Sequence, residues 1–296
     1  MTGDHVEQGT DAFAEHRSLL FTVAYEMLGS AADAEDVVQE SWVRWSEVDK
    51  ARVRDPRAYL VRIVTRQALN HLRTLERRRE RYVGPWLPEP LLTAPDVADD
   101  VELADSVSLA MLVVLDTLSP LERAVFLLRE VFGFGYDEVA EATGRSTAAV
   151  RQLAHRAREH VQARRPGTIP AGELEKVTTS FFAAAATGDL QQLMDLLAPD
   201  VVLLSDGGGK VKAALNPIRG AEKVARFLLA VTPTGAQAEV DVLAVNGAPA
   251  LVVRIDGRID TVATGVMADG RIAELLVVRN PDKLRRLEEE HHLSRR

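Results

Sequence analysis

The sequence predicts two consecutive all-α domains followed by a C-terminal α+β domain. In the predicted helices before residue 165, apolar residues recur at helical spacing. Residues 166–170 contain two prolines and a glycine and mark a domain boundary. Beyond them, two helical segments lead into a series of β segments, an order that favours an α+β cone. A chain of 296 residues is long enough to bury cores in two or three domains.

The composition is that of a globular protein, with 46% hydrophobic and 27% charged residues. The chain has no cysteine, which excludes disulfides and thiolate metal sites and fits a reducing compartment. No apolar run approaches membrane-spanning length, and the first residues lack the pattern of a signal peptide. We therefore expect a cytoplasmic protein that needs no metal or cofactor and does not enter a membrane.

The net charge of −8 is unevenly distributed along the chain. Residues 1–49 hold 11 acidic and 2 basic side chains, whereas residues 50–81 hold 11 basic and 3 acidic ones. A second basic segment covers residues 141–165. Basic islands in an acidic chain can direct phosphate contacts to chosen faces, and acidic segments repel DNA or meet a basic protein.

Two helices are predicted within the first 49 residues, at about 12–28 and 32–48. The second begins with three acidic residues in its first turn, which suits the positive end of a helix dipole. Its valines and tryptophans form an apolar side and leave an acidic, polar face. That face is either a solvated helix surface or a docking surface for a protein partner.

A third helix is predicted from Asp55 and Pro56 to about residue 82. Leu60, Val64 and Ala68 face inward by their spacing, and the opposite side carries a stripe of arginines. Such a stripe is often only a solvated surface. The number of bases here exceeds what solubility requires, so nucleic acid is the favoured partner.

Residues 82–105 contain four prolines and six acidic residues without a base, which predicts an extended linker. Its GPWLPEP segment is apolar in a way that a plain linker does not need. Residues 106–134 predict two helices with a break at 118–120. Ser119, Pro120 and Glu122 form a strong helix-start signature after that break.

Residues 136–161 have the pattern of a helix-turn-helix. Gly144 supplies the positive φ of a tight turn, and Ser146 or Thr147 can cap the following helix. Its outward face carries Arg151 and Gln152, side chains able to form bidentate bonds to guanine and adenine. Taken alone, the pattern leaves open a helical hairpin with a solvated basic face.

The order of these segments resembles the extracytoplasmic-function (group IV) sigma factors of RNA polymerase over about residues 10–165. The resemblance rests on AEDVVQESWVRW, PRAYLVRIVTRQALNHLR, an acidic linker and LSPLERAVFLLREVFGFGYDEVAEATGRSTAAVRQLAHRAREHV. It implies that the acidic helix docks on core RNA polymerase, through Asp33, Glu35, Asp36, Gln39, Glu40 and Trp45. It implies that the Arg-rich helix reads the −10 promoter element, through Tyr59, Arg62, Arg66, Asn70, Arg73 and Arg77. The helix-turn-helix corresponds to the −35 reader, through Arg145, Ser146, Thr147, Arg151, Gln152, His155, Arg156 and Arg158.

The third domain resembles the SnoaL-like, nuclear-transport-factor-2-like cone. Enzymes of that fold work by proton transfer, but residues 171–290 contain no His, Tyr, Trp or Cys. A lone base such as Asp206 or Asp260 would lack its usual partner, so we predict that the protein is not an enzyme. The cone forms a pocket, which leaves a small-molecule ligand open without identifying one.

Three segments add a resemblance to sigma factors that carry a fused SnoaL-like domain, and that resemblance implies regulation by the extension itself. They are GPWLPEP, the glycine-rich SDGGGK and NPDKL, the last of which is expected to begin a charged C-terminal helix. The glycines either permit close backbone approach or form a plain hairpin turn. The candidate regulatory residues are Trp86, Pro88, Asp206, Gly207, Gly208, Gly209, Lys210, Asn280, Pro281, Asp282 and Lys283.

The expected protein is a sigma factor tuned by its own C-terminal domain, with core RNA polymerase and promoter DNA as partners and a stress response as its setting. The alternative is a one-component helix-turn-helix regulator with a ligand-sensing domain. Such a regulator would not need an acidic helix followed by an Arg-striped helix. The expected divisions are sigma domain 2 at 1–81, linker at 82–105, sigma domain 4 at 106–165, linker at 166–172, SnoaL-like domain at 173–284 and charged tail at 285–296.

Overall fold

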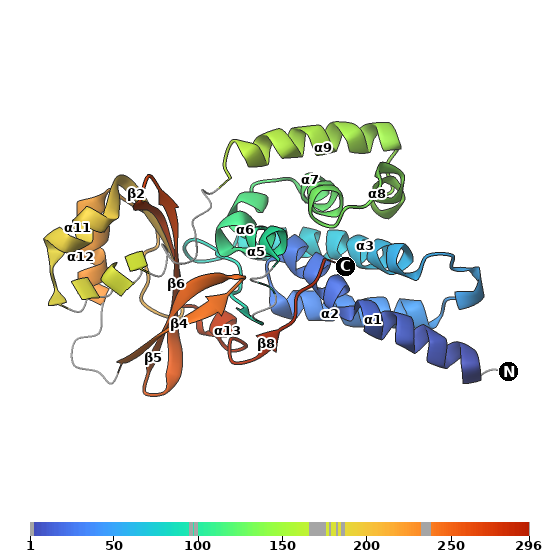
Figure 1. Ribbon diagram of the computed structural model, residues 1–296, viewed down its shortest axis with the longest axis horizontal. Helices are drawn as coiled ribbons and strands as arrows, with labels where there is room; N and C mark the ends of the chain where they lie inside the picture. The colour runs from blue at the N-terminus through green and yellow to red at the C-terminus, as the bar shows by residue number, and fades with distance from the viewer. Residues whose placement is uncertain are drawn as a thin grey trace.

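The structure, a computed structural model, describes residues 3–94, 97, 100–165, 176–177, 179–181, 183–184, 187–231 and 238–295. Helices from the first half of the chain gather on one side, and a twisted sheet with its own helices lies on the other (Figure 1). No helix among the described residues is long and apolar enough to cross a membrane.

The N-terminal helical unit consists of α1 (Gly3–Leu28), α2 (Ala31–Ser46), the short η1 (Lys50–Arg52) and α3 (Pro56–Arg79). The α1 helix begins nine residues before the predicted start at residue 12. Ser30 caps α2 by accepting from the backbone N–H of Asp33. Leu60, Val64 and Ala68 face the core as their spacing predicts.

The second helical unit consists of α5 (Val101–Val107), α6 (Leu109–Leu115), α7 (Pro120–Phe126), the π-helical η2 (Leu127–Val131), α8 (Tyr136–Thr143) and α9 (Thr147–Gln162). The predicted start signal of α7 is confirmed, because Ser119 and Glu122 form a complete capping box. Gly144 ends α8 in the left-handed conformation with φ 66°, and Ser146 caps α9. The α5 helix begins inside the segment predicted as a linker.

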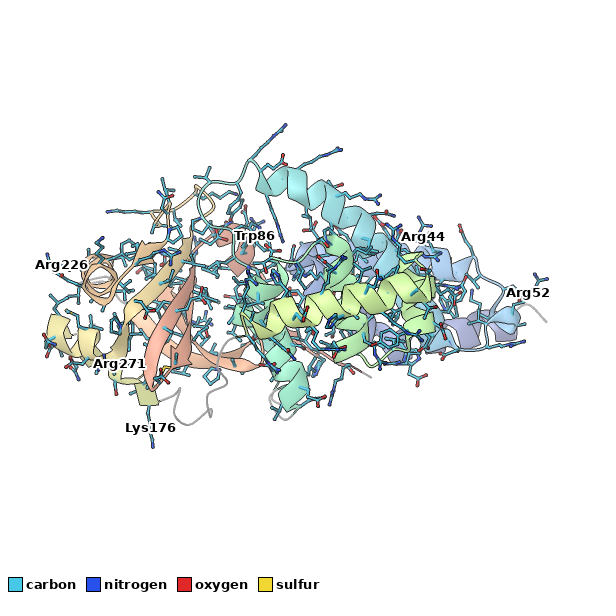
Figure 2. The ribbon with its side chains drawn as sticks, turned by 90° about the horizontal axis from the view of Figure 1, so that it is seen from above. Arg44, Arg52, Trp86, Lys176, Arg226 and Arg271 are labelled. Carbon is cyan, nitrogen blue, oxygen red and sulfur yellow. The ribbon has the colours of Figure 1, made fainter. Side chains whose placement is uncertain are left out.

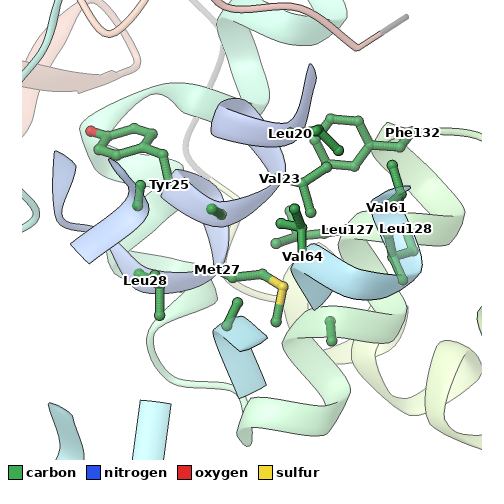
Figure 3. Close-up of a cluster of buried hydrophobic side chains, with 14 of the residues drawn as sticks. Leu20, Val23, Tyr25, Met27, Leu28, Val61, Val64, Leu127, Leu128 and Phe132 are labelled. Atoms are coloured by element: carbon green, nitrogen blue, oxygen red, sulfur yellow. The ribbon is translucent and has the colours of Figure 1, made fainter. Parts of the chain in front are cut away.

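One apolar core spans both helical units. Figure 3 shows Leu20 and Val23 of α1 and Val64 of α3 beside Leu127 and Phe132 of the second unit. Each of these side chains is at most 4% exposed. Separating the two units would therefore expose apolar surface to water, which costs free energy in proportion to its area.

The sheet domain contains α11 (Leu190–Leu196), β2 (Leu197–Asp206), β3 (Ile218–Arg219), α12 (Ala221–Val231), β4 (Ala238–Val245), β5 (Ala248–Ile255), β6 (Arg258–Ala268) and β7 (Arg271–Val278). Strands β4 to β7 form an antiparallel meander, and β2 pairs parallel with β7. Residues 210–215 lie between β2 and β3. Those residues form a turn and irregular chain before β3, which pairs with β2.

The sheet is completed by two strands from outside the meander, giving the order β3-β2-β7-β6-β5-β4-β1-β8. Strand β1 (Leu92–Thr93) comes from the linker, which we define as residues 80–100, and β8 (Glu290–His291) comes from the end of the chain. The predicted charged helix after Asn280 is wrong, because α13 (Pro281–Leu284) ends after one turn. Leu287 and Leu293 are buried in two different apolar clusters, and this anchoring favours an extended path over one straight helix.

The two faces of the sheet have different partners. One face packs on α11 and α12, through residues such as Leu193, Val224 and Leu275. The other face packs on Leu87 of the linker and Leu109 of α6. The second helical unit is therefore seated directly on the sheet domain.

Candidate promoter-reading surfaces and the junction between domains

The outward face of α9 is exposed at the edge of the molecule (Figure 1). The exposed residues on or next to it include Arg145, Ser146, Arg151, Gln152, His155 and Arg156. Several of the predicted −35 residues also have partners within the protein. Ser146 caps α9, Thr147 donates to Asp137 at 2.7 Å, Arg156 contacts Glu122 at 3.4 Å and Arg158 forms an ion pair with Glu130 at 2.6 Å.

The arginine stripe of α3 is partly covered by α8. Arg66 donates to the backbone carbonyls of Glu141 at 2.7 Å and Ala142 at 3.3 Å, and Arg62 forms an ion pair with the Glu141 side chain. Cations at the C-terminus of a helix are favoured by its dipole. Tyr59 packs against Trp45, with the Arg62 guanidinium 4.4 Å from the centre of its ring. The other predicted −10 residues are exposed: Asn70, Arg73 and Arg77.

The acidic face of α2 is only partly open. Asp36, Gln39 and Glu40 are exposed, although Glu40 also accepts from Gln67 at 2.7 Å. Glu35 pairs with Arg17 at 2.7 Å, and Asp33 contacts Arg78 at 3.5 Å.

Trp45 corrects the predicted docking surface. Its side chain is 1% exposed and lies in the core against Tyr59, so it does not belong to the outer face of α2. Trp42, 36% exposed beside Phe13, is the tryptophan that reaches the surface of α2. Both residues carry the same signal in the sequence, and only packing separates them.

Asp206 is the centre of a buried hydrogen-bond network between the sheet domain and the linker. Its Oδ1 accepts from the Tyr82 hydroxyl at 2.5 Å and the Gly208 N–H at 3.1 Å. Its Oδ2 accepts from the Leu87 N–H at 2.9 Å and the Lys283 ammonium at 2.7 Å. Asp206 is 0% exposed, and a carboxylate in that position is tolerated only when it is paired and hydrogen-bonded.

The glycine turn makes room for this network. Gly208 has a φ of 61°, and a Cβ atom there would lie 2.4 Å from the Asn280 side chain. Asn280 in turn donates to the Tyr82 hydroxyl at 2.6 Å. A Cβ on Gly209 would meet Val83 of the linker at 3.0 Å, and one on Gly207 would lie 2.7 Å from the backbone oxygen of Val211.

The three predicted regulatory segments meet around Trp86, which Figure 2 places between the sheet and the helices. The Arg79 guanidinium lies 3.6 Å and the Lys283 ammonium 4.0 Å from the centre of its indole ring. Burial lowers the pKa of Lys283 to about 8, against the opposing effect of Asp206. Gly29, at the end of α1, lies against the edge of the indole ring. A Cβ atom at this position would lie only 2.9 Å from that ring.

The remaining regulatory candidates lie at the edge of this cluster. Pro88 also lies beside Gly29, and Pro281 occupies the first turn of α13. Lys210 forms an ion pair with Asp282, and this hydrogen bond holds the pKa of Asp282 below its usual value.

Asn246, which the sequence analysis did not single out, links three parts of the chain. Its side chain accepts from the Leu91 N–H of the linker at 2.9 Å. It donates to the Tyr25 hydroxyl of α1 at 2.6 Å and to the Val107 carbonyl of α5 at 2.8 Å. The Asn-Gly pair is a recognised hairpin signal, but nothing local to the sequence identifies these distant partners.

A second overlooked network joins the two helical units. Glu26 of α1 is fully buried and accepts from the Ser106 hydroxyl at 2.9 Å. Arg123 donates to the Glu26 backbone carbonyl at 2.8 Å and pairs with Asp116 at 2.9 Å. Burial raises the pKa of Glu26 to about 8, although Ser106 and Arg123 act in the opposite direction.

The C-terminal tail, residues 285–295, runs from the sheet across both helical units (Figure 1). The Ser294 N–H donates to the Thr22 hydroxyl at 2.9 Å, and the His291 ring lies 5.4 Å from that of Phe21. Arg295 pairs with Asp100 at 2.7 Å.

In the described part of the sheet domain, both candidate bases are engaged by other groups of the protein. Asp260, one of the two candidate bases, forms a bidentate ion pair with Arg279, and both oxygens of Asp206 are hydrogen-bonded. The apolar cavity between the sheet and its helices has a volume of about 40 Å³, far below the several hundred Å³ of typical ligand pockets. Among the described residues no three His, Asp or Glu side chains gather as metal ligands do.

Comparison with known families gives three matches along the chain. Residues 12–78 match Sigma-70 region 2, residues 108–161 match Sigma-70 region 4, and residues 178–286 match a SnoaL-like domain. The chain belongs to the ECF RNA polymerase sigma factors, in the form that carries a C-terminal SnoaL-like domain.

Individual relatives agree with this assignment. The chain is 39% identical over 287 residues to "ECF RNA polymerase sigma factor SigJ" of Mycobacterium tuberculosis (strain ATCC 25618 / H37Rv), over 92% of this chain and 91% of the relative. It is 31% identical to "Probable ECF RNA polymerase sigma factor SigI" of Mycobacterium tuberculosis (strain CDC 1551 / Oshkosh), over 92% and 93%. A crystal structure of the Mycobacterium tuberculosis SigJ protein matches with a TM-score of 0.73 at 37% identity, over 93% of this chain and 97% of the other.

These matches confirm the predicted fold class and the sigma-factor function, and they favour that function over the one-component regulator. Sigma regions 2 and 4 imply core RNA polymerase and promoter DNA as partners.

Proposed function

We propose that the SnoaL-like domain holds this sigma factor in a closed state in which its −10 and −35 readers cannot both engage a promoter. One observation carries the proposal: Arg62 and Arg66, both −10 candidates, are bonded to the end of α8, the first helix of the −35 reader. The same arginines cannot hold α8 and DNA at once. Promoter binding therefore requires α3 and α8 to separate.

The contacts of the linker support a role for the SnoaL-like domain in keeping this state closed. The linker joins α3 to α5, so its path sets how far the two readers can move apart. Asp206 and Lys283 hold it near Leu87, and Asn246 holds it at Leu91. Releasing these bonds frees the linker to extend.

The residue roles within this proposal follow the exposed surfaces. Core polymerase is contacted by the acidic face of α2, without Trp45. The −10 element is read by the α3 stripe after α8 has moved away. The −35 element is read by the exposed face of α9. The proposed contacts are, for the polymerase, Asp33, Glu35, Asp36, Gln39 and Glu40; for −10, Tyr59, Arg62, Arg66, Asn70, Arg73 and Arg77; and for −35, Arg145, Arg151, Gln152 and His155, with Arg156 and Arg158 at the margin.

The test is reconstituted transcription with core RNA polymerase and the Asp206→Asn variant. An amide at this position loses the charge that pairs with Lys283 and places an N–H group where donors converge, so the network should break. We expect promoter-specific transcription to increase at limiting polymerase. Asp256→Asn is the matched control, because Asp256 lies in an exposed hairpin turn of the same domain.

Equal transcription by the Asp206→Asn variant and the wild type, at equal folded fraction, would contradict the closed-state proposal. Reduced transcription would do the same, because it would show that the closed contacts assist initiation.

A further inference from the structure

A pocket of about 550 Å³ lies where α2, α3, the linker and the segment after α13 meet. Its wall contains five basic and three acidic side chains, in a protein whose net charge is −8. The basic residues are Arg78, Arg79, Lys283, Arg285 and Arg286.

Two of these cations are already committed to the protein. Arg79 pairs with Asp116 and donates to the Leu28 carbonyl at 3.1 Å. Lys283 is bonded to Asp206. Both also lie over the Trp86 ring, so they build the wall of the pocket and are not free to hold a ligand.

The other three cations are weakly compensated. Arg78 is 69% exposed and contacts Asp33 only at 3.5 Å. Arg285 shares Asp282 with Lys210. Within the described part of the chain, the Arg286 side chain has neither a hydrogen bond nor an ion pair, and only its backbone carbonyl accepts, from the Glu289 N–H at 3.1 Å.

The nearby carboxylate of Glu89 is not available to Arg286 as a close partner. It accepts from the Ala31 N–H at 2.8 Å and from Ser30 at 3.3 Å, and so caps the start of α2. Burial raises the pKa of Glu89, while the charge of Arg286 lowers it from a distance. The start of α2 is thus already satisfied. Among the described residues, Arg286 is the basic residue of the pocket whose side chain has no bonded partner, and Arg78 and Arg285 lie at the same pocket, each with a carboxylate partner.

We propose that this pocket binds a small organic phosphate monoester between Arg78 on one wall and Arg285 and Arg286 on the other. A phosphate monoester carries a charge of about −1.5 to −2 near neutral pH and offers three strong acceptor oxygens to guanidinium groups. Guanidinium groups fit phosphate oxygens in bidentate fashion. The volume falls in the range of small-molecule sites and exceeds what inorganic phosphate fills, and Leu75 and Tyr82 offer surface to the organic part.

The ligand would bridge two parts of the molecule. Arg78 belongs to α3, and the two other arginines belong to the tail of the SnoaL-like domain. A ligand that binds only while these parts are together stabilises that arrangement by mass action. This regulatory consequence rests on the proposed closed state, whereas the binding itself does not.

Binding is measured by calorimetry on the full chain at constant ionic strength, because exposed charges are screened by salt. The probes are ribose 5-phosphate, inorganic phosphate and ribose. We expect saturable binding of ribose 5-phosphate, weaker binding of phosphate and none of ribose. The proposal would be overturned if neither ribose 5-phosphate nor inorganic phosphate bound saturably. It would also be overturned if ribose bound as tightly as ribose 5-phosphate.

Variants locate the site. Arg78→Gln and Arg286→Gln should each weaken ribose 5-phosphate binding about tenfold or more, as expected for a lost charged hydrogen bond. Arg226→Gln is the control, because Arg226 pairs with Glu222 on α12 and lies far from Trp86 in Figure 2. Unchanged binding by both pocket variants, or equal loss in the control, would refute the site, with melting temperatures serving to verify folding.

Transcription then tests the consequence separately. Ribose 5-phosphate should lower promoter output with the wild type and not with Arg286→Gln. Binding without any effect on output would refute the bridging role alone. If Asp206→Asn also leaves output unchanged, the closed state fails as well, so the two failures are distinguishable.

Discussion

At the scale of single residues, buried carboxylates lie at the boundaries between structural units. The three buried acidic residues among those described are Glu26, Glu89 and Asp206. Each accepts a hydrogen bond from another unit or from the linker: Ser106, the start of α2 and Tyr82 respectively. The second carboxyl oxygen of Glu26 is buried without a partner among the described residues. Burying a charge is costly, and separating the units would return it to water. Separating two units at such a boundary therefore costs less free energy than separating them at a purely apolar boundary of the same area.

Glu26 gives a prediction on pH dependence. Its folded pKa of about 8 lies above its usual value of 4.5, so between these limits the folded state keeps a proton that the unfolded state has lost. This group therefore stabilises the protein most below pH 4.5, and its contribution falls as the pH rises toward 8. Urea unfolding at several pH values should show a flatter profile for Glu26→Gln than for the wild type. Parallel profiles would mean that Glu26 is not buried as a neutral acid.

At the scale of elements, the hairpin between β4 and β5 does more than connect two strands. Its Asn246 side chain bonds to α1, the linker and α5, and a Cβ on Gly247 would lie 2.7 Å from the Ala104 Cα. The hairpin therefore acts as a wedge whose tip fits between the helical units. Its sharp turn, with φ 54° at Asn246, is what allows the close approach.

Asn246→Ala tests the wedge. Loss of the three side-chain bonds leaves buried partners unsatisfied, which should lower the free energy of unfolding by at least about 2 kcal/mol beyond any backbone strain. Asp269→Ala is the matched control, because Asp269 has a φ of 52° in the equivalent position of the exposed β6–β7 hairpin. Equal losses in chemical denaturation would assign the effect to the turn conformation alone.

The elements that the sequence predicts correctly are those with local causes. The capping box at Ser119, the left-handed Gly144 and the apolar spacing of Leu60 and Val64 act within a few residues, so they can be read without the fold. The prediction of a C-terminal helix is wrong because the path of this segment depends on contacts with distant parts of the chain. Its charged sequence is helix-compatible, but the burial of Leu287 and Leu293 in separate clusters decides its path.

The candidate sites divide in the same way. The sequence motifs identified Trp86, Asp206 and Lys283 as candidates. In the structure these residues lie together where the linker meets the sheet domain. Asn246 and Glu26 carry no local signal of their partners. The hydrogen bonding of Arg66 to α8 likewise depends on packing, because the sequence of the arginine stripe would be the same if α8 did not cover α3.

At the scale of the whole molecule, three sets of contacts hold the helical units and the sheet domain together. The core shared by α1, α3 and η2 joins the two helical units, and the opposite face of the sheet seats α6. The tail then crosses from β8 to Thr22 and Asp100. Each contact restrains the distance between the promoter readers, so loss of one should loosen the whole arrangement.

Removal of the tail after Glu288 provides the whole-molecule prediction. The truncated chain loses β8 and the bonds to Thr22 and Asp100, so its radius of gyration in solution scattering should increase and its melting temperature should fall. Glu289→Ala is the control, because this exposed side chain can be removed without removing β8. An unchanged radius with an intact circular dichroism spectrum would show that the tail does not restrain the helical units.

Strand β8 forms one edge of the sheet, and its residues are synthesised after those of the other strands. Proteins are synthesised from the N-terminus, and their domains begin to fold in that order. Both promoter-reading units therefore leave the ribosome before residues 290–295 exist to fasten them. Under the proposed closed state, each new molecule passes through an interval in which both promoter-reading units have been made and the segment that fastens them has not.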